Sequence, residues 1–426
     1  MLHFLKNLFT KPKLRNETFI ANSHAFCIMP WVHLHVTQTG IITPCCVAPW
    51  DAEKGFGKIN GQTIDEIWNG EAIRSFRLNQ LKDKPDERCT RCYKKEQSGL
   101  YSLRKATNQE YIRHIDRVKN TQSDGRIVNA PPVYFDIRYS NFCNFKCRIC
   151  GPWSSTSWFN DAKAMGMNEN DLRLTHAIQD EDRFFEMLEQ YLPAAEEIYF
   201  AGGEPLLMEQ HYRVLDMLLQ KGLTKVYLRY NSNFSTFEFK GKSIIDYWKK
   251  FENIFLCASL DDTGKRGELQ RKEQKWKDVI AKRKLLLLEC PHIDFMLAPT
   301  VNILNVFNLP AFHREWTEQG LIDVSEIFPS ILEDPKEYNI QLLPADLKEK
   351  IKELYQNHAA WIELQPSKDE VVKQVVKNEF LKCITFMQAE DLSNLIPNFK
   401  KLTIQLDNLR NENTAETLPE LKVLLD

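Results

Sequence analysis

Three closely spaced cysteines after an apolar, β-prone run constrain this chain more than any other feature. The run from Tyr134 to Tyr139 leads into Cys143, Cys147 and Cys150, with the spacing C-x3-C-x2-C. Thiolates this close together can bind one face of a cuboidal iron–sulfur cluster and leave one iron without a protein ligand. An open metal position of that kind can hold a reactant. A structural zinc knuckle and three unrelated buried cysteines are the alternatives.

The composition is that of an ordinary globular protein and gives no argument for nucleic-acid or membrane binding. The chain has 426 residues, 56 Lys plus Arg and 58 Asp plus Glu, for a formal net charge of -2. No large field of one sign results, and no apolar run has the length of a membrane span. The basic leader at 1–23 lacks the apolar segment and cleavage site of a signal peptide.

Eleven cysteines in a chain of this size need an explanation. A secreted disulfide framework would spread them through a small, loop-rich chain, whereas here most of them lie in two groups. This grouping favours reduced, metal-binding cysteines and predicts a cytoplasmic location. We expect the three isolated cysteines, Cys257, Cys290 and Cys383, to be core thiols.

The first group of cysteines lies on a predicted hairpin and on a C-x2-C pair. Alternating apolar residues at 32–36, a Thr-Gly turn and an apolar pair at 41–42 predict antiparallel strands. Such pairing brings Cys27 near Cys45 and Cys46. A capping box at 63–66 begins a helix, and a second helix from 71 leads to Cys89 and Cys92.

Four of these thiolates can converge on one metal centre. We expect Cys27, Cys89 and Cys92 to contribute, together with either Cys45 or Cys46, because adjacent strand residues point to opposite faces. Zinc fits this number of ligands as well as iron and sulfur do. His33 and His35 share one face of the first strand and are weaker metal-ligand candidates.

From residue 131 the sequence alternates strands and helices at the spacing of β/α units. Expected strands are 133–139, 197–200, 225–230, 254–259, 293–300 and 340–343, and expected helices include 182–191, 210–220, 275–289 and 309–319. We therefore predict an α/β fold in five parts: a leader at 1–23, a cysteine-rich module at 24–100, a helical linker at 101–130, a core at 131–345 and a helical region at 346–426.

A glycine-rich turn follows the second core strand. Gly202 and Gly203 allow a backbone to approach a ligand closely, and Glu204, followed by Pro205, offers a carboxylate for an ammonium group. A plain turn at the end of a strand is the alternative.

Together, the cysteine loop and this Gly-Gly-Glu-Pro turn resemble the signature of the radical S-adenosylmethionine (SAM) enzymes. The resemblance implies a partial (β/α)6 barrel and a [4Fe–4S] cluster whose open iron chelates SAM. It also implies reductive cleavage to a 5′-deoxyadenosyl radical that abstracts hydrogen from a substrate, with an external electron donor such as flavodoxin or ferredoxin. Further cofactor contacts are implied at Asn231, Ser259, Asp261, Arg271, Thr300 and Asn302. Two departures are the missing glycine after Asn231 and an aliphatic Ile149 where relatives carry an aromatic residue.

The N-terminal module resembles the SPASM/twitch module of the same enzymes, which binds auxiliary [4Fe–4S] clusters. Here it precedes the core and lacks the later cysteines of a full SPASM, so one auxiliary cluster is implied. Relatives with such modules often modify peptide or protein side chains, which is the function expected here. Alternatives are a small-molecule dehydrogenase, a non-catalytic zinc or iron–sulfur protein, and a related scaffold without catalysis.

Overall fold

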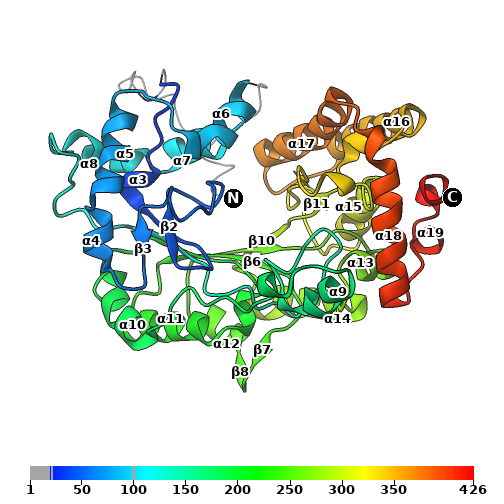
Figure 1. Ribbon diagram of the computed structural model, residues 1–426. Helices are drawn as coiled ribbons and strands as arrows, with labels where there is room; N and C mark the ends of the chain where they lie inside the picture. Colours follow the sequence, from blue (N-terminus) through cyan, green and yellow to red (C-terminus); the bar gives the residue numbers. More distant parts are fainter. Residues whose placement is uncertain (1–19, 21–22, 98–100) are drawn as a thin grey trace. The chain divides into compact units, whose positions relative to one another are not determined.

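The computed structural model describes residues 20, 23–97 and 101–426 (Figure 1). These residues form two compact units, which we describe separately. Unit 1 comprises Met1–Asn141, Thr175–Tyr230 and Lys250–Ile254, and unit 2 comprises Phe142–Leu174, Asn231–Lys249 and Phe255–Asp426. The N-terminal cysteine-rich segment and the first core strand thus belong to one unit. Most of the predicted leader at 1–23 lies outside the described residues.

The sheet of unit 1 joins the predicted hairpin to the predicted core strands. β1 (His33–Val36) pairs antiparallel with β2 (Ile41–Thr43), as the alternation predicted, and β2 pairs antiparallel with the short β3 (Gly57–Lys58). On its other side β1 runs parallel to β4 (Tyr134–Ile137), which pairs in parallel with β5 (Glu197–Phe200). β5 in turn pairs in parallel with β6 (Tyr227–Ser232). The cysteine-bearing hairpin is therefore an extension of the parallel sheet.

One face of this sheet is polar. Two rows of side chains lie in register across β1, β4, β5 and β6: His33, Tyr134, Glu197 and Tyr227, then His35, Asp136, Tyr199 and Arg229. The alternate positions are apolar and buried: Leu34, Phe135, Ile198 and Leu228. A parallel sheet is usually apolar on both faces, so the polar face is unusual and its groups must be paired with one another.

In unit 1, the helix that the capping box predicts begins at that signal. α4 (Ile64–Trp68) has the predicted capping box, in which the Thr63 side chain accepts from the Glu66 N–H and Glu66 accepts from the Thr63 N–H. The other helices are α3 (Met29–Val32), α5 (Glu71–Leu81), α6 (Thr90–Gln97), α7 (Leu103–Glu110), α8 (Ile115–Lys119), α10 (Glu181–Glu189) and α11 (Glu209–Gln220).

In unit 2, β9 (Ile254–Ala258, in unit 2 from Phe255) runs parallel to β10 (Asp294–Leu297), and β11 (Thr300–Val301) runs parallel to β12 (Ser330–Ile331). The sixth predicted strand at 340–343 is wrong, because a 3-10 turn spans Ile340–Leu342. The Asn339 side chain accepts from the Gln341 N–H and starts that turn. A short apolar run of this kind does not distinguish a strand from a buried turn.

The remaining helices of unit 2 are α9 (Phe159–Ala164), α12 (Ile244–Trp248), α13 (Gly264–Gln270), α14 (Trp276–Glu289), α15 (Leu309–Glu318), α16 (Ala345–Leu364), α17 (Glu370–Ala389), α18 (Ile396–Arg410), α19 (Thr414–Thr417) and α20 (Lys422–Leu425). The last five, yellow to red in Figure 1, make the predicted helical C-terminal region. Among the described helices, none combines the length and the apolar character that crossing a membrane requires. The three isolated cysteines are buried, as predicted.

Candidate metal centres and cofactor site

The loop that carries Cys143, Cys147 and Cys150 lies in unit 2 and has no regular secondary structure. Hydrogen bonds from neighbouring side chains hold its backbone in place. The Ser157 hydroxyl donates to the Cys143 carbonyl at 2.8 Å, and the Trp158 indole N–H donates to the Cys147 carbonyl at 2.9 Å. These bonds fix the peptide groups beside two of the three cysteines. The loop therefore has a defined shape without regular secondary structure.

The three thiols of this loop lie in a polar environment. Cys147 and Cys150 share a hydrogen bond, which lowers the pKa of Cys147 and raises that of Cys150. The Arg271 guanidinium lies 3.8 Å from the Cys147 sulfur and lowers its pKa further. The Asn233 amide lies 3.6 Å from the Cys143 sulfur. Metal binding requires thiolates; Asn233 and Arg271 favour negative charge on the Cys143 and Cys147 sulfurs, whereas Cys147 and burial disfavour it on Cys150.

Arg271 and Asp261 form a buried ion pair. The Arg271 Nε lies 2.8 Å from an Asp261 carboxylate oxygen, and the other oxygen accepts from the Thr300 N–H at 2.8 Å. The sequence implied cofactor contacts for all three residues. In the structure, contacts link Thr300 to Asp261, Asp261 to Arg271, and Arg271 to the Cys147 sulfur.

The other implied contact residues of unit 2 differ in their surroundings. The Asn302 side chain is bound within its own turn, donating to the Thr300 carbonyl at 2.7 Å and accepting from the Leu304 N–H at 2.8 Å. Ser259 is half-buried, whereas Asn231 is exposed. Asn233, two residues after Asn231, approaches the cysteine loop instead, and it lies in the same polar run that drew attention to Asn231.

The Gly-Gly-Glu-Pro turn lies in unit 1. Gly202 has a φ of +121°, a conformation that favours glycine, and the Gly203 N–H donates to the Ser140 carbonyl at 3.1 Å. Glu204 is buried, and one of its carboxylate oxygens accepts from the Leu206 N–H at 3.2 Å as Pro205 begins a 3-10 turn. The predicted need for glycine is met at Gly202.

A cavity in unit 1 gathers four of the five N-terminal cysteines. Its lining includes Cys27, Cys45, Cys89 and Cys92 but not Cys46, and is otherwise mainly apolar, with three arginines: Arg88, Arg91 and Arg104. Burial raises the pKa of all four thiols, that of Cys27 to about 11. The choice between Cys45 and Cys46, which the sequence left open, favours Cys45 on this geometry.

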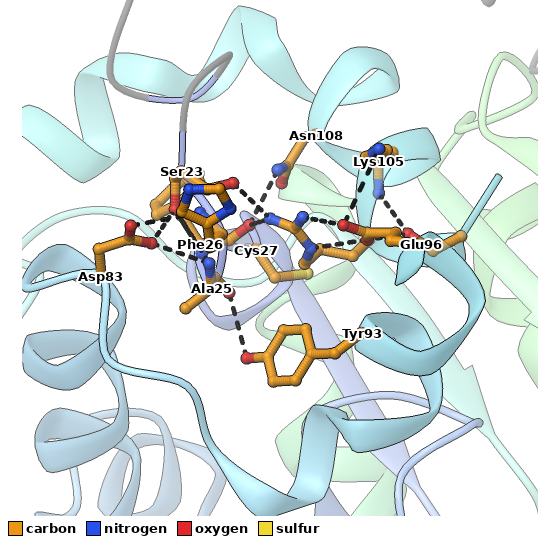
Figure 2. Close-up of polar contacts among 12 residues, drawn as sticks. Ser23, Ala25, Phe26, Cys27, Asp83, Tyr93, Glu96, Lys105 and Asn108 are labelled. Atoms are coloured by element: carbon orange, nitrogen blue, oxygen red, sulfur yellow. Dashed lines mark hydrogen bonds and ion pairs between the residues drawn. The ribbon is translucent and has the colours of Figure 1, made fainter. Parts of the chain in front are cut away.

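The segment that carries Cys27 is anchored on both sides (Figure 2). Asp83 accepts from the Ala25 N–H at 2.8 Å, and Asn108 donates to the Phe26 carbonyl at 3.0 Å. Arg104, which pairs with Glu96, also donates to the Phe26 carbonyl at 2.8 Å. The position of Cys27 is therefore set by helices α6 and α7 and by the turn after α5, all well away from it in sequence.

Sulfur spacing distinguishes a single ion from a cluster. A tetrahedral zinc site with Zn–S bonds of about 2.3 Å places its sulfurs about 3.8 Å apart. Among the described residues, no three cysteine sulfurs all lie within 4.8 Å of one another. Neither cysteine set therefore places three sulfurs at the mutual spacing of a single zinc ion, although Cys147 and Cys150 are close enough to share a hydrogen bond.

The group that does have single-ion spacing is His33, His35 and Asp136, within 4.8 Å. However, Arg138 already binds both Asp136 oxygens, at 2.6 and 2.9 Å. Burial opposes ionisation of Asp136, but Arg138 and His35 hold the pKa of its carboxyl well below the usual value. Burial lowers the pKa of His33 to about 3. A divalent cation here would add uncompensated buried charge. We interpret the group as part of the polar sheet face, not as a metal site.

Comparison with known families identifies the N-terminal segment. Residues 27–93 match the SPASM family, described as an iron–sulfur cluster-binding domain. The matched range contains all five N-terminal cysteines and ends just after Cys92. The predicted resemblance of this segment to SPASM modules is confirmed. No curated protein matches the chain significantly.

Solved structures give similarities of low score. One is anSMEcpe, solved with bound AdoMet and a peptide: 15% identity, TM-score 0.37, and 52% of this chain against 58% of that one. Another is Streptococcus suis SuiB bound to its precursor peptide SuiA: 13% identity, TM-score 0.37, and 79% of this chain against 71% of that one. The chain therefore matches a little over half the length of the first.

Proposed function

We propose that this chain is a radical SAM enzyme with an auxiliary iron–sulfur cluster. The observation that carries the proposal is the loop with Cys143, Cys147 and Cys150, in which the Asn233 amide lies beside the Cys143 sulfur and the Arg271 guanidinium lies beside the Cys147 sulfur. The SPASM match over residues 27–93 supports the second cluster. We propose Cys27, Cys45, Cys89 and Cys92 as the ligands of that second cluster.

The residues of this chain would bind and orient the cofactors. Arg271, held by Asp261, supplies positive charge beside the cysteine loop, and Asn233 offers amide hydrogens to Cys143. Glu204 and the backbone of Gly202 and Gly203 would meet the amino group of SAM. Cys143, Cys147 and Cys150 would hold a [4Fe–4S] cluster, and the chemistry that such a cluster would supply when bound is one-electron reduction of SAM.

The substrate that we propose is a peptide or protein side chain. SPASM modules occur in enzymes that modify such substrates, and residues 27–93 of this chain match that family. A cytosolic setting with flavodoxin or ferredoxin as electron donor completes the proposal. Dehydrogenation of a small molecule is the second candidate.

Anaerobic reconstitution with iron and sulfide tests the proposal. With SAM and dithionite, we expect the wild-type chain to form 5′-deoxyadenosine and to hold roughly eight irons. The C143A/C147A/C150A variant should form none and keep about half of the iron. A Cys383→Ala variant, which removes a buried helix thiol, should behave as wild type. Stoichiometric zinc without sulfide, or 5′-deoxyadenosine from the triple variant, would contradict the proposal.

A further inference from the structure

Arg148 lies inside the cysteine loop, between Cys147 and Cys150, and its charge is completely buried. Its side chain has no exposed surface. Its backbone N–H donates to the Gln270 carbonyl at 2.8 Å, which holds the peptide group next to Cys147. A buried guanidinium of this kind is stable only when carboxylates neutralise it.

Both carboxylates that neutralise Arg148 come from the C-terminal end of the chain. The Arg148 guanidinium binds Asp407, in the last turn of α18, and binds Glu412, just beyond that helix, at 2.6 Å. Glu412 also binds Lys272 at 2.9 Å. Asp407 in turn accepts from the N–H and the hydroxyl of Thr414, both at 2.8 Å, which shapes the turn between α18 and α19.

A second contact ties the same helix to the same loop. Arg410, the last residue of α18, donates to Asp161 at 2.7 Å, and its guanidinium lies 4.6 Å from the centre of the Trp158 indole. Lys146, between Cys143 and Cys147, binds the other oxygen of Asp161 at 3.0 Å. Both cationic side chains that lie between the cysteines are therefore bound to a network that includes the end of α18.

We propose that Asp407 and Glu412 are positioning residues for the cysteine loop, and that the segment from α18 to α19 is part of the cluster site. This inference rests on the proposed function, because it concerns the loop proposed to bind the SAM-cleaving cluster. Without the two carboxylates, the buried Arg148 charge would be uncompensated, and the Cys147–Cys150 turn would move to bring it to water. The loop would then hold its three thiolates less well for cluster binding.

Neutral, isosteric substitutions in the full chain test this inference. The D407N/E412Q variant removes both charges, and Glu416→Gln removes an exposed carboxylate of the same segment as a matched control. We expect hydrogen exchange of the peptide covering 143–150 to accelerate about tenfold in D407N/E412Q, and iron to be lost to a chelator about tenfold faster. The Glu416→Gln control should match wild type in both.

Two further variants separate positioning from general misfolding. Glu412→Asp keeps the charge and should retain most of the protection, whereas Arg148→Met should reduce the effect of D407N/E412Q, because no buried charge then needs a partner. A changed electron paramagnetic resonance signal of the reduced cluster on SAM addition would report the altered loop directly. If D407N/E412Q aggregates, Glu412→Gln alone provides the same comparison.

The outcomes distinguish this inference from the proposed function. Exchange at 143–150 that is equal in D407N/E412Q and Glu416→Gln would overturn the positioning role. Hydrogen exchange measured on the cluster-free protein tests the contacts of Arg148 with Asp407 and Glu412 in the absence of any metal. A wild-type chain that holds no iron dependent on Cys143, Cys147 and Cys150 would instead overturn the proposed function, even if the exchange result were as expected.

Discussion

The ion pair between Arg271 and Asp261 allows a quantitative test of how the cysteine loop is supported. Arg271 and Asp261 are 7% and 1% exposed, and the Arg271 Nε lies 2.8 Å from the carboxylate. Arg271→Met leaves Asp261 buried without a counter-charge, which should cost about 3–5 kcal/mol of unfolding free energy. Asp261→Asn should cost a similar amount because it leaves the guanidinium unpaired, although an asparagine can still accept from the Thr300 N–H.

The double variant R271M/D261N carries neither charge, so its loss should be much smaller than the sum of the two single losses. We expect a coupling energy of roughly 3 kcal/mol in this cycle. Urea unfolding of the cluster-free protein, followed by tryptophan fluorescence, measures it without interference from metal. Losses that add within about 0.5 kcal/mol would refute the conclusion that these residues act as one buried pair.

The same pair should affect the chemistry of the loop. Because Arg271 lowers the pKa of Cys147, both variants that lack Arg271 should bind iron more weakly at the 143–150 site than wild type at neutral pH. The double variant therefore should regain stability but not iron affinity. If the double variant regained both stability and iron affinity, Arg271 would affect iron binding only through the stability of the fold.

Three other predictions follow from the described contacts. Cys45→Ala should lose the iron of the N-terminal cavity, whereas Cys46→Ala should keep it, as iron and sulfide analysis will show; the reverse result would exclude Cys45 as a ligand. Cys89→Ala should still form 5′-deoxyadenosine from SAM in the absence of substrate. Loss of the 143–150 cluster in that variant would contradict the prediction that the two cysteine sets bind their clusters independently. Burial lowers the pKa of His313 to about 3 and that of His358 to about 2, so below pH 6.5 the unfolded chain binds more protons than the folded chain and the folded state loses stability. By pH 5 each histidine should cost roughly 2 kcal/mol of unfolding free energy. Between pH 6.5 and pH 5, the urea midpoint of His358→Gln should therefore fall less than that of wild type, and an equal fall would contradict this reasoning.

Local patterns predicted the elements of this chain well because each depends on neighbours in sequence. The hairpin at β1 and β2, the capping box at Thr63 and the helices α10, α11, α14 and α15 formed as predicted. The sixth strand failed because its apolar run at 340–343 has no periodicity that separates a strand from a turn. The parallel pairing of β1 with β4 joins segments about a hundred residues apart, and no local signal in either segment specifies it.

The sites show the same limit. Sequence spacing identified both cysteine sets, but it could not decide between Cys45 and Cys46, since that choice depends on which side chain faces the cavity. It implied cofactor contacts at Asp261 and Asn302 but not the hydrogen bonds that both side chains make within the protein. The acidic partners of Arg148 were invisible, because a charge pair between residues 148 and 412 leaves no pattern in either segment.

The two cysteine sets differ in how polar groups approach their sulfurs, which bears on their different proposed roles. The N-terminal cavity has a mainly apolar lining with three arginines, and burial raises the pKa of its four thiols. In the 143–150 loop, Arg271 and Asn233 approach the sulfurs of Cys147 and Cys143, and the pKa of Cys147 is lowered while that of Cys150 is raised. Four thiolates around one cavity would suit the proposed auxiliary cluster, because each of its irons would then have a protein ligand. Three thiolates with polar groups beside them would suit the proposed cluster with an open iron, since fixed polar groups stabilise the charge of a bound ionic cofactor.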